Sequence, residues 1–364
     1  MMRYRLLIPM LFVAAWQLAA QQGTAQDAPA PESRLGFRYS IAVIEDATLY
    51  SNLQEPIPKL LNQVLLEPTI TLRYKPRWSF SWRVVGLTTA YSDTATQLRV
   101  KETYAGLSAG DFDFMLGRRI VRWGTGYAFT AIGVLDPPRI PTNPTDRLNL
   151  NEGRDMVKAD YVHGPHAFTL AWSTAALAPA AANLHDASAF RYNVLVHGFD
   201  TALIAGDDRG GDAFGGITFT RVLGQAWELH GEAAWREHEA ALLGAKYTTR
   251  LGVTFIGEFY TPPNIPYYRD MTISPLAPRQ HYLFLDAGKN RLRERPGWKE
   301  WDFGVYAVAN LNDRSYTAIF DANRRFGNRF SSYLHMEIPA GKPTSEYGAT
   351  PYSEATSAGV RFQL

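Results

Sequence analysis

A long, proline-bearing segment carries charges that could sort solutes without making or breaking bonds. Residues 124–154 span about 30 residues, whereas a usual connection has about 2–6. Acids and bases that face one another across a passage create a transverse field, which selects solutes by size and dipole. An ordinary external loop would explain the same composition. The charged residues of this candidate constriction are Asp136, Arg139, Asp146, Arg147 and Glu152.

A second set of charged residues alternates with apolar residues. On a strand, such alternation places the two kinds of side chain on opposite faces. The early members are basic and the late members acidic, which predicts a basic wall facing a more acidic one. Solvated charge in a water-filled lumen explains each residue singly. The set is Arg73, Arg83, Arg99 and Lys101, followed by Glu228, Glu232, Asp302 and Glu337.

Three arginines between these sets have no settled direction. Arg118 and Arg119 are adjacent, so on a regular strand they point to opposite faces unless a bulge reorients one. Arg122 precedes Trp123, an aromatic residue of the kind that forms girdles at membrane interfaces. Arg119 and Arg122 therefore join the candidate lining residues.

One motif could indicate nucleophilic catalysis. Gly106 to Gly110 matches G-x-S-x-G, which needs a strand, a sharp turn and then a helix to expose its serine. Phe112, Phe114 and Leu116 follow with the period of a strand instead, so a hairpin turn is favoured. The histidines show no zinc-ligand spacing, and phosphate-binding and dinucleotide fingerprints are absent. We expect no enzyme, cofactor or metal; an outer-membrane hydrolase using Ser108 is a minor alternative.

The elements that must position these residues are strands with a period of two. Trp78, Phe80 and Trp82, for example, alternate with Ser79 and Ser81. We expect about 18 strands, with 16 also open, and many have the roughly 9–11 residues that a tilted membrane-spanning strand needs. They are expected near residues 36–44, 66–75, 78–91, 96–108, 111–123, 155–163, 166–176, 188–197, 199–206, 212–222, 226–237, 239–247, 251–261, 279–287, 299–310, 315–325, 329–340 and 354–364.

Short and long connections alternate along the chain, as in barrels with short periplasmic turns and long external loops. The exceptions are short connections at 92–95 and 311–314 and a longer one at 288–298. The short turns are 75–77, 108–111, 163–166, 197–199, 223–225, 248–250 and 326–328. The long loops are 45–65, 124–154, 177–187, 207–211, 262–278 and 341–353.

The N-terminus reads as a secretory signal over residues 1–25, with Arg3 and Arg5 before an apolar run. Cleavage before Gln26 would leave a periplasmic segment, 26–35, and a barrel domain, 36–364. It would also lower the formal net charge from +2 to 0, so nucleic acid is not an expected partner. No other segment has the apolar length of a membrane helix, and a chain that crosses a bilayer otherwise must form a closed barrel.

The last strand has an apolar face formed by Val360, Phe362 and Leu364. It resembles the C-terminal signal that the barrel-assembly machinery reads, although that signal usually ends in Phe or Trp. We expect this machinery and outer-membrane lipids to be partners.

Residues 118–129, the prolines at 137–138 and the polar stretch 146–155 resemble porin-like outer-membrane families of Gram-negative bacteria. These families carry a G-R-x-x-x-x-W-G strand end before a loop rich in Pro and Asp, and Gly117, Arg118, Trp123 and Gly124 hold that spacing. Residues 310–315 and 345–348 resemble late hairpin loops of the same families. The resemblance implies passive or selective passage of small solutes.

The sequence thus predicts an all-β transmembrane antiparallel barrel with long external loops, acting as a channel for small solutes. A barrel that serves envelope assembly or export is the alternative. Assembly into a homo-oligomer stays open.

Overall fold

The computed structural model describes residues 35–52, 59–74, 78–90, 97–133, 135–137, 139–144, 147–148, 151–174, 186–208, 212–235, 239–261, 280–289 and 300–364. Only the backbone is described for 78–90, 97–99, 208 and 212. Several predicted features therefore lie outside the described residues: the signal, segment 26–34, the 75–77 turn, connections 92–95, 177–185, 209–211, 262–278 and 290–298, Asp146, and the side chains of Arg83 and Arg99.

The described chain forms strands that follow the alternation of its sequence. They are β1 (Leu35–Ser51), β2 (Leu60–Tyr74), β3 (Trp78–Ala90), β4 (Gln97–Ala109), β5 (Phe112–Arg119), β6 (Arg154–His163), β7 (His166–Thr174), β8 (Ala187–Val196), β9 (Phe199–Asp208), β10 (Asp212–Leu223), β11 (Trp227–Trp235), β12 (Glu239–Thr248), β13 (Val253–Thr261), β14 (Tyr282–Lys289), β15 (Trp301–Asn310), β16 (Ser315–Phe326), β17 (Phe330–Ala340) and β18 (Glu354–Gln363). No helix in the described ranges is long and apolar enough to cross a membrane.

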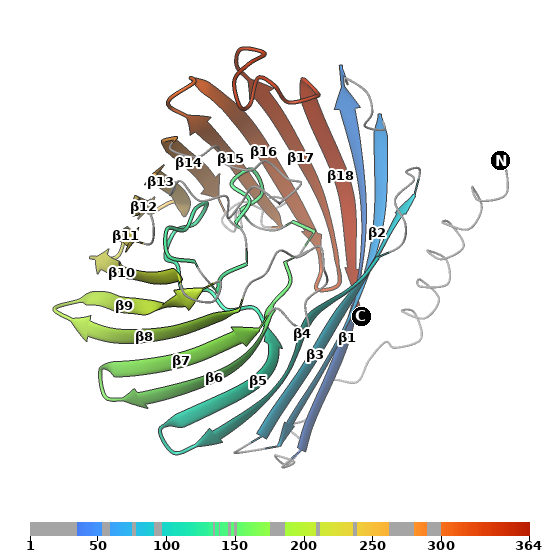
Figure 1. The fold of residues 1–364 in the computed structure, drawn as a ribbon. Coiled ribbons are helices and arrows are strands. Elements are labelled where there is room, and N and C mark those ends of the chain that lie inside the picture. Colours follow the sequence, from blue (N-terminus) through green and yellow to red (C-terminus); the bar gives the residue numbers. More distant parts are fainter. Residues whose placement is uncertain are drawn as a thin grey trace.

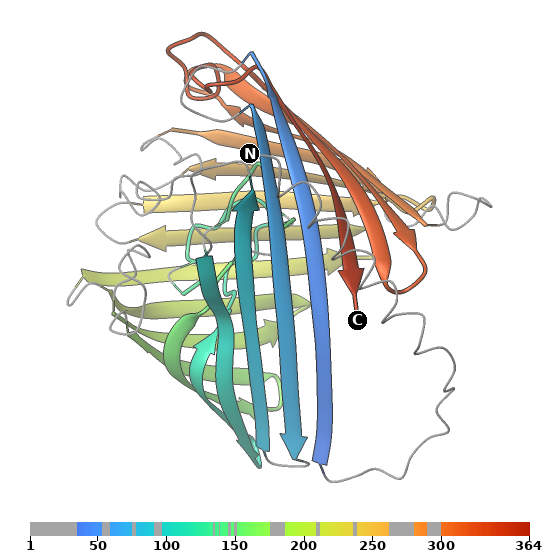
Figure 2. The same cartoon turned by 90° about the vertical axis from the view of Figure 1, so that its right-hand side faces the viewer.

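Each strand pairs antiparallel with the next, and the first also pairs with the last. The β1–β18 register runs from Ala42 opposite Gln363 to Ser51 opposite Glu354, so the eighteen strands form a hydrogen-bonded ring (Figure 1). Figure 2 shows this wall from the side, with the C-terminus at the tip of β18. The predicted barrel of about 18 antiparallel strands is confirmed.

The expected loop 45–65 is wrong. β1 continues to Ser51 and β2 begins at Leu60, which leaves a much shorter connection. Asp46 and Thr48, two polar residues of this stretch, are inward-facing strand residues that are almost fully buried. Polar residues are the normal content of an inward strand face, so they do not signal a strand end.

The tight turns that join even-numbered strands to the next strand lie at one end of the ring. His197 and Gly198 both have positive φ, 49° and 78°, between β8 and β9. Positive φ at both central residues fits a two-residue hairpin whose twist matches that of the strands. The long connection between β5 and β6 and the 341–353 loop lie at the opposite end, as the predicted alternation requires.

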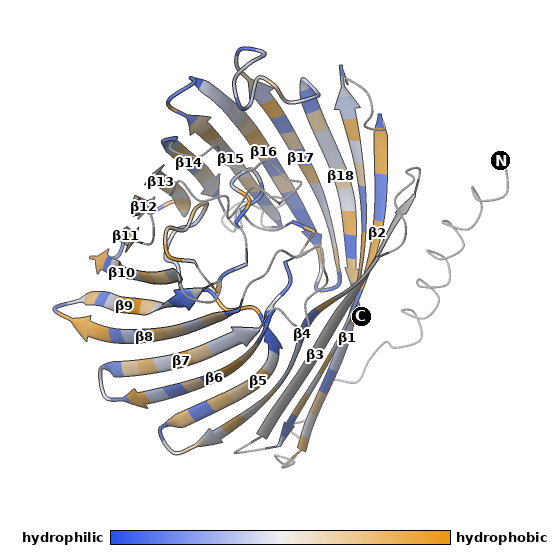
Figure 3. Cartoon of the chain, viewed as in Figure 1, coloured by the Kyte–Doolittle hydropathy of each residue, from blue (hydrophilic) through white to orange (hydrophobic). Residues whose placement is uncertain are grey.

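The outward face of the wall is apolar and the inward face is mixed. On β7, Phe168, Leu170 and Trp172 are exposed, whereas Ala171 and Ser173 on the other face are buried. Figure 3 shows the resulting bands of alternating hydropathy along the strands. Trp227 is also exposed, with 47% of its surface accessible. An exposed apolar band of this extent is unfavourable in water but suits a hydrocarbon environment.

Candidate constriction in the lumen

The described residues between 120 and 153, which connect β5 to β6, lie inside the ring of strands (Figure 1). We call this the lumenal segment. Trp123, Ile132 and Leu135 pack against a buried apolar cluster from β7 to β10 that includes Ala189 and Ile204. Small wall residues allow the segment to approach closely. At Gly216 an added Cβ would lie 2.3 Å from Ile132 Cδ1.

A second apolar cluster holds the middle of the lumenal segment. Phe129 stacks on Tyr260, with ring centroids 4.9 Å apart, and lies near Tyr282. Tyr347, from the 341–353 loop, belongs to the same cluster. Two of the long connections therefore share one packed core inside the barrel, against the wall formed by β12 to β16.

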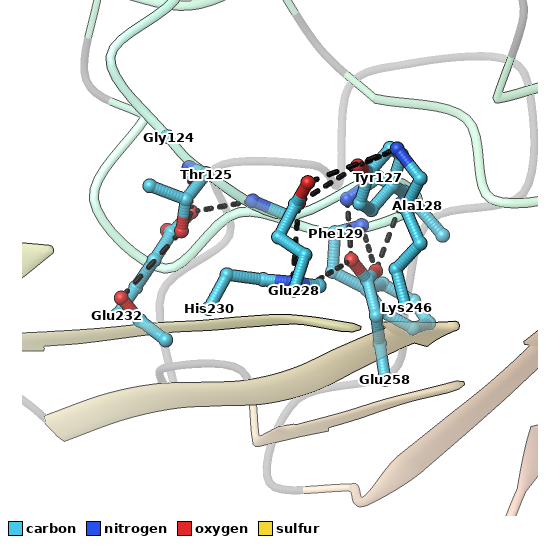
Figure 4. A network of polar contacts seen from close by, with 12 residues as sticks. Gly124, Thr125, Tyr127, Ala128, Phe129, Glu228, His230, Glu232, Lys246 and Glu258 are labelled. Carbon is cyan, nitrogen blue, oxygen red and sulfur yellow. Dashed lines mark hydrogen bonds and ion pairs between the residues drawn. The ribbon is translucent and has the colours of Figure 1, made fainter. Parts of the chain in front are cut away.

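Glu232 of β11 holds two turns of the lumenal segment at once (Figure 4). One carboxylate oxygen accepts hydrogen bonds from the backbone N–H groups of Thr125 and of Gly126, the latter at 2.9 Å. The other accepts the N–H groups of Ala131 at 2.6 Å and Ile132 at 3.2 Å. A buried carboxylate is tolerated where several donors compensate for its lost hydration.

Glu258 of β13 makes a parallel set of contacts (Figure 4). It accepts hydrogen bonds from the backbone N–H groups of Tyr127, of Ala128 at 2.9 Å and of Phe129 at 3.4 Å. His230 Nε2 lies 2.9 Å from the same carboxylate, and its ring is fully buried. Two neighbouring wall carboxylates thus fix residues 125–132.

Asp136 folds the lumenal segment back on itself. Its carboxylate accepts the N–H groups of Trp123 at 2.6 Å and Gly124 at 3.2 Å. Arg139 lies 3.7 Å from this carboxylate and donates to the carbonyl oxygens of Gly124 and Tyr127. Burial raises the pKa of Asp136, although these donors act in the opposite direction.

The Tyr127 side chain lies at the edge of the segment. Its hydroxyl donates to Glu228 Oε1 at 2.8 Å and accepts from Lys246 Nζ at 2.9 Å. Lys246 also lies 3.7 Å from Glu228. Burial raises the pKa of Tyr127.

The far end of the lumenal segment reaches the β17–β18–β1 wall. Arg147 Nη2 lies 3.6 Å from Asp46 Oδ1, and its guanidinium is 5.4 Å from the centroid of the Tyr333 ring. The Tyr333 hydroxyl donates to the same carboxylate at 2.6 Å. Leu148 packs against Ile44 and other apolar wall residues. The segment therefore contacts opposite sides of the ring.

A cavity of about 680 Å³ remains between the lumenal segment and the wall. Tyr127, Pro144 and Arg147 line it from the segment. The wall contributes the charged residues Asp286, Asp302, Asp321 and Arg361.

Comparisons with known proteins point to one class of fold. No family model matches the chain, and no curated protein matches it. Among solved structures, Pseudomonas aeruginosa OccK11 (OpdR) is similar with a TM-score of 0.62 at 9% identity, covering 90% of this chain and 96% of that chain. Pseudomonas aeruginosa OccK5 (OpdH) has a TM-score of 0.60 at 8% identity, covering 90% and 98%. A mutant of the Rh. blastica porin has a TM-score of 0.51 at 10% identity, covering 90% and 100%. The chain has a porin-like fold.

In this porin-like barrel, three residues that we predicted to line the passage make structural contacts instead. Glu232, Asp136 and Arg139 do not face open lumen but hold the lumenal segment together or to the wall. Alternation correctly placed Glu232 on the inward face, but it carries no information about what covers that face. Arg147 lines the cavity.

In the early basic set, Lys101 does not line open lumen. Lys101 is fully buried, and its Nζ lies 3.9 Å from Glu67 Oε1. Arg119 lies over the Tyr104 ring at 4.7 Å, and Arg73 is inward and exposed near the end of β2. A register shift opposite Arg83 and Val84 interrupts regular alternation on β4 beside Lys101.

The remaining candidates are distributed around the barrel. Asp302 pairs with Arg325 at 3.2 Å, and Glu337 accepts a hydrogen bond from Thr317 at 3.4 Å. Arg122 is exposed. Glu152 lies 3.6 Å from Arg118, whose other partner, Asp155, is at 2.6 Å.

The inward residues that sequence did not single out include Asp46, Glu258, Asp286 and Asp321. Alternation within β1, β13, β14 and β16 could have identified them. Ser108 belongs to a hairpin between β4 and β5 and donates to Asp113, so the G-x-S-x-G stretch lacks the helix that a nucleophile elbow needs.

Proposed function

We propose that the protein is a diffusion channel for small solutes in the outer membrane of a Gram-negative bacterium. The observation that carries this proposal is the lumenal segment, which is bonded to the wall and leaves a polar cavity beside it. The apolar outward face supports a membrane location, and the porin-like fold supports a channel. Residues 1–25 would direct export and be removed.

Selection in such a channel is steric and electrostatic. A segment fixed by buried carboxylates keeps a constant cross-section without an energy source. Charged side chains along the remaining passage then favour solutes with complementary charge. The proposed charged lining is that of the cavity: Arg147, Asp286, Asp302, Asp321 and Arg361.

Conductance in planar bilayers tests the proposal. Refolded protein should give discrete, stable current steps, and heat-denatured protein should give none. A correctly folded barrel that inserts yet leaves the membrane electrically tight would overturn the channel and favour the role in envelope assembly or export.

We also propose that the outward face of β18 is read by the barrel-assembly machinery. Phe362 lies opposite Val43 and Phe330, and Leu364 exchanges backbone hydrogen bonds with Ile41. Val360 lies on the same face. Replacing Phe362 with Asn should slow assembly in cells. The same variant should still refold in detergent, because it changes no backbone hydrogen bond; equal assembly rates would contradict the proposal.

A further inference from the structure

The cavity beside the lumenal segment is large enough for a single small solute. Its volume of about 680 Å³ falls within the roughly 300–1,000 Å³ range of small-molecule sites. Its lining comes from β13 to β18, from β1 and from the lumenal segment. Its chemistry therefore bears on which solutes the proposed channel passes.

Strand register places acidic and basic groups at one depth in this cavity. Asp321 lies opposite Gly304 and His335, and Tyr333 and Arg361 follow two residues further along the next strands. Asp286 lies opposite Tyr306, two residues from Gly304, so the register moves by two residues at three of the four steps from β14 to β18 and not at all from β15 to β16. The mean offset of about 1.5 residues per strand is close to what a tilt of about 35–45° requires for positions at equal height. Asp286, Asp321, Tyr333 and Arg361 thus form a belt along one side of the lumen, from β14 to β18, which we call the charged belt.

Two members of the charged belt have no side-chain partner among the residues that the structure describes. Asp286 on β14 and Arg361 on β18 both line the cavity, at opposite ends of the belt. By contrast, Asp302 is paired with Arg325, and Asp321 with His335 Nδ1 at 2.6 Å. The belt therefore offers one free anion and one free cation, separated by three strands.

Arg147 strengthens the basic end of the charged belt. It extends from the lumenal segment over Tyr333 and lines the cavity, with its Nη2 atom 3.6 Å from Asp46 Oδ1. Its Nε and Nη1 atoms have no hydrogen-bond partner among the described residues. The acidic end has Asp321 next to Asp286. A solute with only one charge meets attraction at one end and repulsion at the other.

We infer that the charged belt selects zwitterionic solutes, such as amino acids or betaines. The solute carboxylate would lie toward Arg361 and Arg147, and its ammonium group toward Asp286 and Asp321. Both charges of the solute are then attracted electrostatically, whereas a simple anion or a simple cation is attracted at one end of the belt and repelled at the other. This inference rests on the proposed channel function and adds its substrate class.

Uptake into proteoliposomes from one equimolar mixture tests the inference. The mixture contains glycine betaine, choline, 3,3-dimethylbutyrate and arabinose. The first three share one shape and are zwitterionic, cationic and anionic, whereas arabinose is uncharged. Relative to arabinose, betaine should enter about tenfold faster than choline or 3,3-dimethylbutyrate, which corresponds to about 1.4 kcal/mol.

Two variants separate the ends of the charged belt. Asp286→Asn should slow the entry of betaine and choline and speed up the entry of 3,3-dimethylbutyrate. Arg361→Gln should have the opposite effect on the two singly charged probes: it should slow the entry of 3,3-dimethylbutyrate and speed up that of choline. Matched controls are Asp200→Asn on β9 and Arg38→Gln, which lies on β1 below its last pair with β18. Both controls should keep the wild-type preference.

The outcomes distinguish the two proposals. If arabinose fails to enter, the channel itself is overturned, and the inference with it. If arabinose enters but betaine has no advantage, or if the controls change the preference as much as the belt variants do, the channel stands and the zwitterion site is overturned.

Discussion

Replacing Glu232 with Gln should release the lumenal segment from the β11 wall. Each carboxylate oxygen of Glu232 accepts two backbone N–H groups. An amide has only one acceptor oxygen, so in either orientation its NH₂ group faces two buried donors. A buried donor left unpaired costs about 1–3 kcal/mol, which gives about 2–6 kcal/mol for the variant. At the lower value, attachment is about thirtyfold weaker.

Single-channel recording measures this release. When the segment leaves the wall, the passage widens, so Glu232→Gln should show a higher mean conductance with frequent transitions between levels. The matched control is Glu228→Gln, two inward positions away on the same strand, with His230 between. Glu228 accepts one hydrogen bond from Tyr127 and forms a partly exposed ion pair with Lys246, worth about 0–1 kcal/mol.

The result that would refute this reasoning is equal behaviour of the two variants. If Glu232→Gln, shown by circular dichroism and heat-modifiable gel mobility to be a folded barrel, has the conductance and noise of Glu228→Gln, the carboxylate does not hold the segment.

Three further predictions concern the wall and the outer loops. Leu243→Arg places a charge on the outward face of β12 and should lower the free energy of unfolding in lipid by about 2–4 kcal/mol. The control Leu251→Arg, in the turn before β13, should lower it by only about 0–1 kcal/mol. Urea titration in vesicles compares the two variants, and equal costs would contradict a membrane-facing wall. Gly216→Val should displace Ile132 and raise channel noise, while Gly257→Val, whose Cβ would meet only Leu285 at 3.6 Å, should leave recordings unchanged. Burial raises the pKa of Glu346 above its ordinary 4.5, so the ordered 341–353 loop is most stable at low pH and loses stability as the pH rises through the raised pKa. The rate of proteolysis of this loop should therefore increase from pH 5 to pH 8. Glu346→Gln should remove this dependence of the proteolysis rate on pH.

The strand pattern was readable from sequence because each wall residue faces either lipid or lumen. That binary choice repeats every two residues, so Trp78, Phe80 and Trp82 identify a strand without knowledge of its neighbours. Asp46 and Thr48 show the limit of the rule. Where the inward residues are polar and the outward ones small or mixed, as in residues 45–51, strand and loop compositions converge.

The constriction was only partly readable. Length and charge identified residues 124–154 as a candidate constriction. They did not show which charged side chains would hold the segment in place and so would not face the passage. Glu232 and Thr125 are 107 positions apart in the chain, and their contact depends on the path of the whole segment through the lumen. Alternation gives the face of a residue and not its partner. For the same reason the sequence could not separate Glu232, which is bonded, from Asp286, which has no described side-chain partner.

The seam between β1 and β18 has a consequence for biogenesis. Ten residue pairs join strands from the two extremes of the chain, so neither edge can be satisfied until the final strand has been delivered. During that interval both edges present open N–H and C=O groups that can template aggregation. Loss of even the last few residues would leave a gap in the cylinder that lipid cannot seal. Closure of the whole cylinder therefore depends on this one seam between the first and the last strand.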